Sequence, residues 1–384
     1  MRKTKILFVL GSLGGGGAER VTLHLLRHLD RRRFILSLAL LKGPDDYISL
    51  LPDDVNVHRL GVRARYAVLP LARLIRSAKP DIVFSTSPHV DQVLCLAVKF
   101  SRHTPEIVLR SPNYPSMSLR TEPFYVRRLA KWSYHSADTV IALTHAMKEN
   151  MIHKFGLSPQ RIAVIPNPVD VELIQALSKQ SVVHPWFQKD EKAKHPLVIS
   201  MGRLELQKGF KYLLEAFAKV TAKFDARLVI LGKGSQINEL KKLGEKLGIT
   251  SRLAFLGFQK NPYKYLARAD LFVLASLWEG FPNALVEAMA CGIPVVSTDC
   301  PSGPSEILSN GEYGSLVPCG DSMALAEAIE GILSNKEKAA MLAAAGQKRA
   351  NDFCVTRIIA QYEKLFSTFS TKMEGGRSGS SSVG

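Results

Sequence analysis

The chain has 384 residues, of which 46% are apolar and 22% charged, so it suits a folded protein of two domains and excludes a disordered or fibrous one. No apolar run approaches the roughly 20 residues that cross a bilayer. The net charge of +17 is uneven, because residues 1–170 hold 25 basic and 13 acidic side chains. This excess favours an anionic partner, with an ordinary solvated surface as the alternative.

The start of the chain and its cysteines indicate a reducing compartment. Residues Met1 to Leu10 are basic and then apolar, like a signal peptide, but the apolar stretch is short and runs into glycines, so a first β-strand explains it better. The five cysteines are odd in number, widely spaced and without a C-x-x-C pair. Neither a disulfide framework nor a zinc site follows, and the cytoplasm is the expected location.

Short apolar runs alternate with helix-patterned segments along the whole chain. Near-continuous Val, Ile and Leu runs between helices are typical of parallel strands covered on both faces. We therefore predict an α/β fold of two Rossmann-like, doubly wound parallel-sheet domains facing across a cleft, with ligands beyond the carboxyl ends of the strands. The predicted strands are Ile6–Leu10, Ile35–Leu41, Asp81–Ser85, Ile107–Arg110, Thr139–Leu143 and Ala163–Ile165, then Leu197–Met201, Arg227–Leu231, Leu253–Leu256, Leu271–Ala275, Pro294–Ser297 and Gly314–Val317.

Changes in composition mark the domain boundaries. The stretch from Lys179 to His195 is polar, charged and without helical periodicity, which is typical of a linker, and the Gly- and Ser-rich C-terminus is typical of a disordered tail. The predicted organisation is a first Rossmann-like domain (1–170), a linker (171–195), a second Rossmann-like domain (196–350), a helix that crosses back to the first domain (351–370) and a disordered tail (371–384).

Two glycine-containing loops each follow the first strand of a half and precede a helix. In the first, Gly14 to Gly17 would let backbone N–H groups approach an anion at a helix N-terminus, with a plain tight turn as the alternative. This loop matches neither the G-x-G-x-x-G dinucleotide fingerprint nor a P-loop, which disfavours dehydrogenases and P-loop enzymes. In the second loop, Arg203 and Lys208 suit a diphosphate, although a pair of surface cations is the alternative.

The segment from Ser276 to Val296 is the most informative. Glu279 follows a predicted strand, and Glu287 comes eight positions later in a helix that begins near Asn283. Two carboxylates in such positions can accept hydrogen bonds from the hydroxyls of two different sugar rings. The backbone N–H groups from Gly280 to Ala284 are donors at a helix start and can hold phosphate or hydroxyl oxygens.

This segment resembles the E-x7-E signature of family 4 glycosyltransferases, with Glu279 and Glu287 as its glutamates. The resemblance covers about residues 5 to 365 and is more specific in the second half. It implies a GT-B fold, retention of anomeric configuration without a metal or cofactor, and a UDP-sugar donor. The bacterial members it most resembles build lipopolysaccharide, capsule or undecaprenyl-diphosphate-linked glycans. Its other motifs, in the expected order, are Gly14–Gly17, Gly202–Gly209, Gly257–Tyr263 and Ser302–Glu306.

The resemblance makes the first domain (1–170) the acceptor side and the second domain (196–350) the nucleotide-sugar-binding side, and it also implies residue roles. Arg203 and Lys208 would bind the donor diphosphate and stabilise the leaving nucleotide, Glu279 would hold the transferred sugar, and Glu287 the ribose. The expected catalytic residues are thus Arg203, Lys208 and Glu279, and the expected substrate-binding residues are Gly14, Gly15, Gly16, Gly17, Asn113, Gly280, Phe281, Asn283, Ala284, Leu285 and Glu287.

One departure from the family concerns a histidine that many members carry after the fourth or fifth strand of the first half. Here the strand Ile107–Arg110 is followed by Ser111 to Pro115, without a histidine. Asn113 or Arg110 is the expected replacement. His89 and His145 lie at the ends of other strands and are expected to be loop or capping residues.

Two basic segments in the first half are expected to lie on helices. Phe124 to Tyr134 mixes aromatic residues with cations, and a second run of cations flanks the apolar residues Val68 to Ile75. Basic amphipathic helices bind anionic headgroups, which predicts a peripheral enzyme at the cytoplasmic face of the inner membrane; the alternative is aromatics facing the core and cations facing water.

The predicted function is transfer of a hexose or N-acetylhexosamine from a nucleotide sugar to a lipid-linked or polysaccharide acceptor. A UDP-sugar epimerase of the same general fold is the alternative, and it would need further acid–base residues in the first half, where no such cluster is evident. A nucleic-acid-binding protein would carry a recognised binding motif beside its charge, and none is present.

Overall fold

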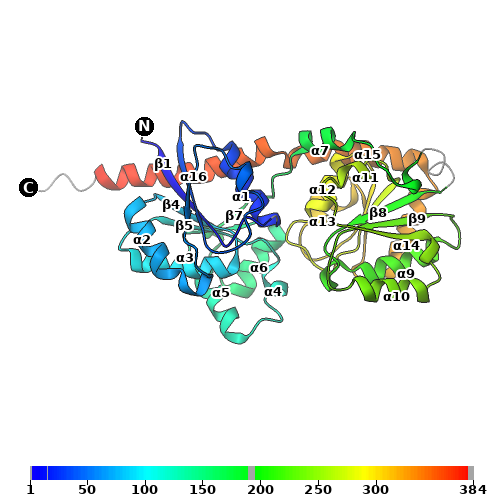
Figure 1. The fold of residues 1–384 in the computed structure, drawn as a ribbon, viewed down its shortest axis with the longest axis horizontal. Coiled ribbons are helices and arrows are strands. Elements are labelled where there is room, and N and C mark those ends of the chain that lie inside the picture. Colours follow the sequence, from blue (N-terminus) through cyan, green and yellow to red (C-terminus); the bar gives the residue numbers. More distant parts are fainter. Residues whose placement is uncertain (1, 15, 189–194, 379–384) are drawn as a thin grey trace, which may run out of the picture. The chain divides into compact units, whose positions relative to one another are not determined.

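The computed structural model describes residues 2–14, 16–188 and 195–378, with side chains to residue 369. The chain divides into two compact units. Unit 1 contains residues Met1–Pro168 and Val355–Gly384, and unit 2 contains Val169–Cys354. The chain therefore passes from unit 1 to unit 2 and back again (Figure 1).

Unit 1 is built on a parallel sheet of order β3-β2-β1-β4-β5-β6-β7. The order reverses between β1 and β4, which is the switch point where doubly wound sheets bind ligands. The strands are β1 (Thr4–Leu10), β2 (Phe34–Leu40), β3 (Asn56–Arg59), β4 (Ile82–Ser85), β5 (Glu106–Arg110), β6 (Thr139–Ala142) and β7 (Ile162–Val164). The helices are α1 (Gly17–His28), α2 (Val68–Ala78), α3 (Pro88–Ser101), α4 (Pro115–Ser118), α5 (Phe124–Ser136), α6 (His145–Phe155) and α16 (Val355–Ser378), with short 3-10 turns η1 (Ile48–Leu50), η2 (Ala64–Tyr66) and η3 (Pro159–Arg161).

Unit 2 repeats this plan with the order β10-β9-β8-β11-β12-β13 and a switch point between β8 and β11. The strands are β8 (Leu197–Met201), β9 (Arg227–Leu231), β10 (Leu253–Gly257), β11 (Leu271–Leu274), β12 (Val295–Thr298) and β13 (Ser315–Val317). The helices are α7 (Val171–Ser178), α9 (Phe210–Val220), α10 (Ile237–Lys246), α11 (Tyr263–Leu266), α12 (Asn283–Ala290), α13 (Pro304–Ile307), α14 (Ser322–Leu333) and α15 (Lys336–Ala350), with short turns η4 (Pro185–Phe187), η5 (Leu206–Lys208), η6 (Thr250–Arg252), η7 (Ser309–Gly311) and η8 (Asn351–Phe353).

The predicted fold class, two doubly wound parallel sheets, is confirmed. Every predicted strand is present within one or two residues, and the sequence missed β3. This strand has the sequence Asn-Val-His-Arg, is only half buried, and lies at the sheet edge beside β2. An edge strand needs no continuous apolar run, because one side of it has no neighbouring strand.

Two segments differ from the expectations for them. Part of the region predicted to be a linker (171–195) is the helix α7, which begins at the Asp170 cap and buries Val171 and Ile174 within unit 2. Residues 189–194 lie outside the described part. The backbone of α16 remains helical to Ser378, through the start of the predicted disordered tail, because extending an existing helix costs far less than nucleating one. Residues 379–384 of that tail lie outside the described part.

Helix α16 belongs to unit 1 although it ends the chain. Its buried Tyr362 and Phe366 pack with Phe84 of β4, with ring centroids 6.2 Å apart in both pairs, and Phe366 also meets Phe34 of β2. These aromatic side chains are part of the apolar core on that face of the sheet. The helix is therefore held by burial of its apolar side.

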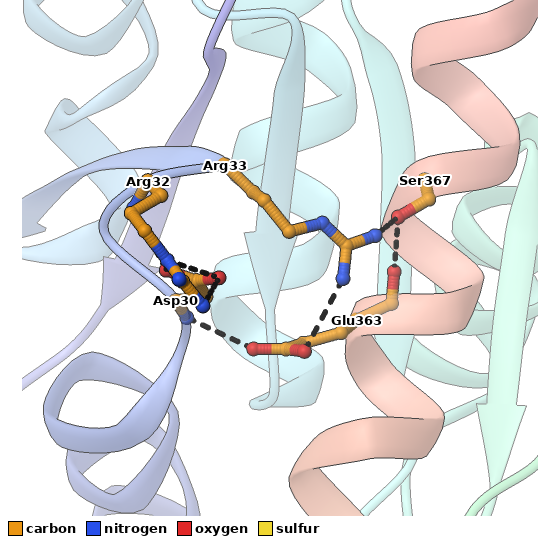
Figure 2. A network of polar contacts seen from close by, with 5 residues as sticks. All are labelled: Asp30, Arg32, Arg33, Glu363 and Ser367. Atoms are coloured by element: carbon orange, nitrogen blue, oxygen red, sulfur yellow. Dashed lines mark hydrogen bonds and ion pairs between the residues drawn. The ribbon is translucent and has the colours of Figure 1, made fainter.

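A polar network adds to this attachment (Figure 2). Glu363 of α16 accepts a hydrogen bond from the backbone N–H of Asp30 at 2.9 Å and pairs with Arg33 at 3.4 Å. Arg33 also donates to Ser367, one turn further along α16. The loop between α1 and β2 thereby holds two successive turns of the C-terminal helix.

Candidate functional site

The carboxyl ends of β8 and β11, the two strands at the switch point of unit 2, bring a lysine and a glutamate together. Lys208 Nζ donates to Glu279 Oε1 at 2.6 Å, and the side chains are only 17% and 6% exposed. Ser276 Oγ donates to the same carboxylate oxygen at 2.6 Å. The buried carboxylate is thus satisfied by one cation and one hydroxyl, as a buried charge must be.

The side chain of Gln207 holds the two loops in register. Its Nε2 donates to Trp278 O at 2.8 Å, while its backbone oxygen accepts from Leu277 N at 2.8 Å. Arg203 donates to Gln207 Oε1 at 3.3 Å and otherwise remains exposed. Arg203 and Lys208 are therefore positioned by the same loop, one at the surface and one mostly buried.

Two glycines allow these loops to approach each other. Gly209 has φ +61°, and a Cβ there would lie 2.0 Å from the oxygen of Ala275, at the end of β11. Gly232, with φ +141°, lies similarly close to Gly202, since a Cβ added to Gly232 would be 1.8 Å from Gly202 O. Any side chain at these positions would push apart the backbone segments that carry Arg203, Lys208 and Glu279.

The second glutamate of the signature has a separate environment. Glu287 is buried in the middle of α12, and the Tyr263 hydroxyl donates to its Oε1 at 3.4 Å. Burial raises the pKa of the neighbouring Cys291 to about 12, and the charge of Glu287 adds to this shift. Glu279 and Glu287 thus offer two carboxylates with different partners, and the adjacent thiol stays protonated.

The start of α12 presents unused backbone donors. Pro282 precedes the helix, and no side chain caps it. Within the described part of the chain, the N–H groups of Gly280, Phe281 and Ala284 donate to no protein atom. Together with the positive end of the helix dipole, these donors can hold anionic oxygens. Asn283 and Leu285 donate instead to Phe281 O and Pro282 O, which tightens the turn.

The predicted site residues of unit 1 lie in different surroundings. Gly14 packs against Pro44, and Gly16 precedes α1 with the Glu19 carboxylate beside it, so that an added Cβ on Gly16 would be 2.3 Å from Glu19 Oε2. Gly17 begins α1, and Gly15 lies outside the described part. An acidic side chain already occupies this helix N-terminus.

The two suggested replacements for the family histidine also differ. Asn113 is half-buried, and its backbone oxygen accepts a hydrogen bond from Ser111 Oγ at 3.1 Å, while its side-chain amide has no hydrogen-bond partner among the described residues. Arg110 is fully buried and donates to Thr86 Oγ1 at 2.7 Å and to Asn167 Oδ1. Arg110 therefore binds within unit 1 and has little surface to offer a ligand.

Several polar residues of unit 2 take part in the site without having been predicted. Ser276 and Gln207 contact the predicted residues directly, and Ser302 Oγ donates to Gly280 O at 2.8 Å. Ser276 directly follows the predicted strand Leu271–Ala275, and Gln207 adjoins Lys208 in the loop after another predicted strand. Their positions after strands were the signal by which the sequence could have identified them as site residues. Ser302 comes from the loop after β12, which nothing in the sequence linked to Gly280.

The described residues contain no group of three or more His, Cys, Asp and Glu side chains arranged to hold a metal ion. None of the helices in the described part of the chain is long and apolar enough to cross a membrane.

Comparisons with known proteins identify two family models, one in each half of the chain. Residues 185–349 match the model described as glycosyl transferases group 1, and residues 15–173 match the model described as glycosyltransferase family 4. The family 4 match lies almost entirely in unit 1, and the group 1 match lies in unit 2.

Two curated relatives are enzymes of bacterial surface glycans. The lipopolysaccharide 1,6-galactosyltransferase of Escherichia coli is 30% identical over 268 residues, which is 68% of each chain. The Campylobacter jejuni N-acetylgalactosamine-N,N'-diacetylbacillosaminyl-diphospho-undecaprenol 4-alpha-N-acetylgalactosaminyltransferase is 28% identical over 346 residues, 86% of this chain and 90% of its own.

Solved structures share the whole fold. Anabaena HepE in complex with UDP and glucose superimposes with a TM-score of 0.79 at 25% identity, covering 95% of this chain and all of that one. Its complex with UDP-glucose gives a TM-score of 0.80.

Proposed function

Because the chain belongs to glycosyltransferase family 4, we propose that it transfers a hexose or N-acetylhexosamine from a UDP-sugar to a lipid-linked glycan or surface-polysaccharide acceptor. The observation that carries this proposal is the Lys208–Glu279 pair beside the free amides of Gly280, Phe281 and Ala284. The two relatives named above act on lipopolysaccharide and on a diphospho-undecaprenol glycan, and HepE binds UDP and glucose.

The donor diphosphate would bind to the cations of the β8 loop. An ammonium group has three N–H donors, and Lys208 uses one of them on Glu279, so two remain for phosphate oxygens. Arg203 has an exposed guanidinium held by Gln207 and can bind a second phosphate in a forked geometry. The amides at the start of α12 would complete this anion site.

The sugar rings of the donor would bind to the two carboxylates. Glu287 would accept hydrogen bonds from the ribose hydroxyls. Its carboxylate lies within α12 and already accepts a hydrogen bond from one hydroxyl, that of Tyr263. Glu279 would accept from hydroxyls of the transferred sugar while Lys208 and Ser276 hold it in place. This division assigns each glutamate to a different part of the donor.

We further propose that transfer retains the anomeric configuration and requires neither a metal nor a cofactor. Glu279 is ion-paired and buried, so it is a poor nucleophile, and a double displacement through it is disfavoured. The acceptor hydroxyl would attack from the face that the diphosphate leaves, and the leaving phosphate would take its proton. Arg203 and Lys208 would stabilise the charge that develops on that phosphate, a role that preorganised donors fill in enzymes.

Unit 1 carries a surface suited to an anionic membrane, which we propose lies at the cytoplasmic face of the inner membrane. Phe124 and Tyr125 of α5 are 64% and 66% exposed, and Leu129 is also exposed one turn on. The cations Arg127, Arg128 and Lys131 accompany them on the same helix. Exposed aromatic residues beside cations bind the headgroup region of anionic bilayers.

The test of the proposal is UDP release from UDP-glucose, UDP-galactose, UDP-N-acetylglucosamine and UDP-N-acetylgalactosamine. Each donor is assayed with and without undecaprenyl-diphosphate-linked glycans extracted from a Gram-negative bacterium, and with truncated lipopolysaccharide core. Release from one donor that rises with an acceptor supports transfer. Conversion of the donor to another UDP-sugar without release would establish the epimerase, and silence in folded protein would contradict the proposal.

A further inference from the structure

The carboxyl ends of β1 and β4 form the switch point of unit 1, and the segments that follow these strands lie against each other. Gly11 directly follows β1, and a Cβ at Gly11 would lie 3.6 Å from Val90 Cγ2 in the first turn of α3. Ligands of doubly wound sheets bind at this position. A polar side chain in the first turn of α3 is therefore well placed to meet a ligand of unit 1.

Asp91 occupies that turn and is almost completely buried, at 1% exposure. In the part of the chain that the structure describes, its Oδ1 has no hydrogen-bond partner. The hydroxyl of Ser85, at the end of β4, and Nε2 of Gln92 are also buried without partners. Asp91 and Ser85 lie close enough for the Ser85 hydroxyl to lower the pKa of Asp91, yet in the described structure neither Asp91 Oδ1 nor that hydroxyl makes a full hydrogen bond, whereas buried polar atoms are ordinarily paired.

The charge of Asp91 is not compensated by a cation. Burial raises its pKa from 3.8 to about 7, and the interactions with the Ser85 hydroxyl and the Ser87 backbone lower it in part. The other groups coupled to it are the Cys95 thiol of α3 and the Tyr134 hydroxyl of α5, and neither is basic. An ionised Asp91 therefore destabilises the folded unit, which is characteristic of a group retained for binding rather than for stability.

We propose that Asp91 binds the acceptor, with its carboxylate accepting a hydrogen bond from a sugar hydroxyl of the glycan. The Ser85 hydroxyl beside Asp91 completes this subsite, because a sugar hydroxyl can both donate and accept a hydrogen bond. The inference rests on the proposed function and names the residues of unit 1 that recognise the acceptor of that reaction. A single structural water held by Asp91 and Ser85 is the competing explanation.

The test compares Asp91→Asn with Asp81→Asn as a matched control. Asp81 is also a buried carboxyl beside β4, but it precedes the strand and has partners, since it accepts from Lys5 N at 2.8 Å and pairs with Arg2 at 3.0 Å. Transfer is measured at saturating UDP-sugar against increasing amounts of the undecaprenyl-diphosphate-linked glycan extract. UDP affinity is measured separately by titration calorimetry.

We expect Asp91→Asn to raise the apparent KM for the extract by about tenfold, the effect of losing one hydrogen bond to a charged group. Its UDP affinity should stay within about twofold of wild type, and Ser85→Ala should raise the same KM by a smaller factor. Asp81→Asn should leave the KM unchanged while lowering thermal stability.

An unchanged KM for Asp91→Asn and Ser85→Ala, in wild-type-like protein that transfers sugar, would overturn the subsite and leave the proposed function standing. If UDP affinity falls as much as the KM for the acceptor rises, the subsite is also overturned, because a structural defect affects both. If Asp91→Asn fails to fold, the KM of Ser85→Ala for the glycan extract decides whether the subsite stands. If the wild-type protein releases no UDP with any acceptor, the proposed function falls and the subsite with it.

Discussion

The two units share one plan, yet the polar groups at their switch points are treated in opposite ways. In unit 2 the buried carboxylate of Glu279 has a cation and a hydroxyl as partners. In unit 1 the buried carboxyl of Asp91 has no cation acting on it, and among the described residues neither its Oδ1 nor the neighbouring Ser85 hydroxyl makes a full hydrogen bond. Unit 2 thus holds a preorganised charge pair, whereas unit 1 buries a carboxyl that has no counterion.

Breaking the charge pair of unit 2 should have the largest effect. Lys208→Ala removes the cation that pairs with Glu279 and that would stabilise the leaving diphosphate, so turnover should fall by about 10²–10³-fold. The melting temperature should fall as well, because a buried carboxylate loses its counterion. Steady-state UDP release and thermal melts check both effects.

The control for this variant is Lys211→Ala, since Lys211 is an exposed lysine whose ion pair with Glu215 spans 3.9 Å. It should be close to wild type in both measurements. A Lys208→Ala protein that turns over at the wild-type rate would remove Lys208 from the site.

Replacing Glu287, the second glutamate of the E-x7-E signature, should have a smaller effect than replacing Lys208, and this effect should be confined to donor binding. Glu287→Gln keeps the shape of the side chain but removes its charge, so UDP affinity should fall by about tenfold. Tyr263→Phe removes the hydroxyl that donates to Glu287 and should weaken UDP binding less. Calorimetric titration with UDP measures both, and wild-type affinity in Glu287→Gln would contradict the ribose assignment.

The buried carboxyl of Asp91 should make the stability of the folded protein depend on pH. Its folded-state pKa of about 7 lies above the ordinary 3.8, so the folded protein holds a proton that the unfolded chain releases between these values. Wild-type stability should therefore decrease as the pH rises from about 4 to about 7, by on the order of a few kcal/mol. Asp91→Asn should lack this decrease, and its melting temperature should exceed the wild-type value at pH 8 by more than at pH 5. Parallel melting curves for the two proteins across this range would refute the uncompensated burial of Asp91.

Substitutions on the exposed face of α5 should have the smallest effect on the reaction itself. Replacing Phe124 and Tyr125 together by Ser should reduce binding to vesicles containing anionic phospholipid, because both side chains are exposed and available to insert. Melting temperature and UDP affinity should be unaffected. Vesicle sedimentation checks this prediction, and unchanged binding would assign these aromatics no membrane role.

The sequence predicted the fold because buried parallel strands have an unmistakable apolar pattern. It placed Lys208 and Glu279 in two separate loops, but it could not show that they contact each other. That contact depends on the pairing of β8 with β11, strands separated by two others in the chain. The resemblance to a family supplied the roles of these residues, and the structure supplied their geometry.

Asp91 illustrates what the sequence could not reveal. It lies in an ordinary helical segment, and its significance comes from burial without a partner, which depends on the packing of β4 and α3. The attachment of α16 to unit 1 is similar, since Glu363 and Arg33 are far apart in the chain. Contacts of this kind depend on tertiary packing and leave no local pattern.

Unit 2 should bind the nucleotide through the loop after β8 and the start of α12. Hydrogen–deuterium exchange with and without UDP tests this binding mode directly, because the amides of Gly280, Phe281 and Ala284 have no acceptor among the residues that the structure describes. We expect UDP to slow exchange most strongly in residues 202–210 and 279–287. Bound UDP that leaves both segments unprotected would contradict it.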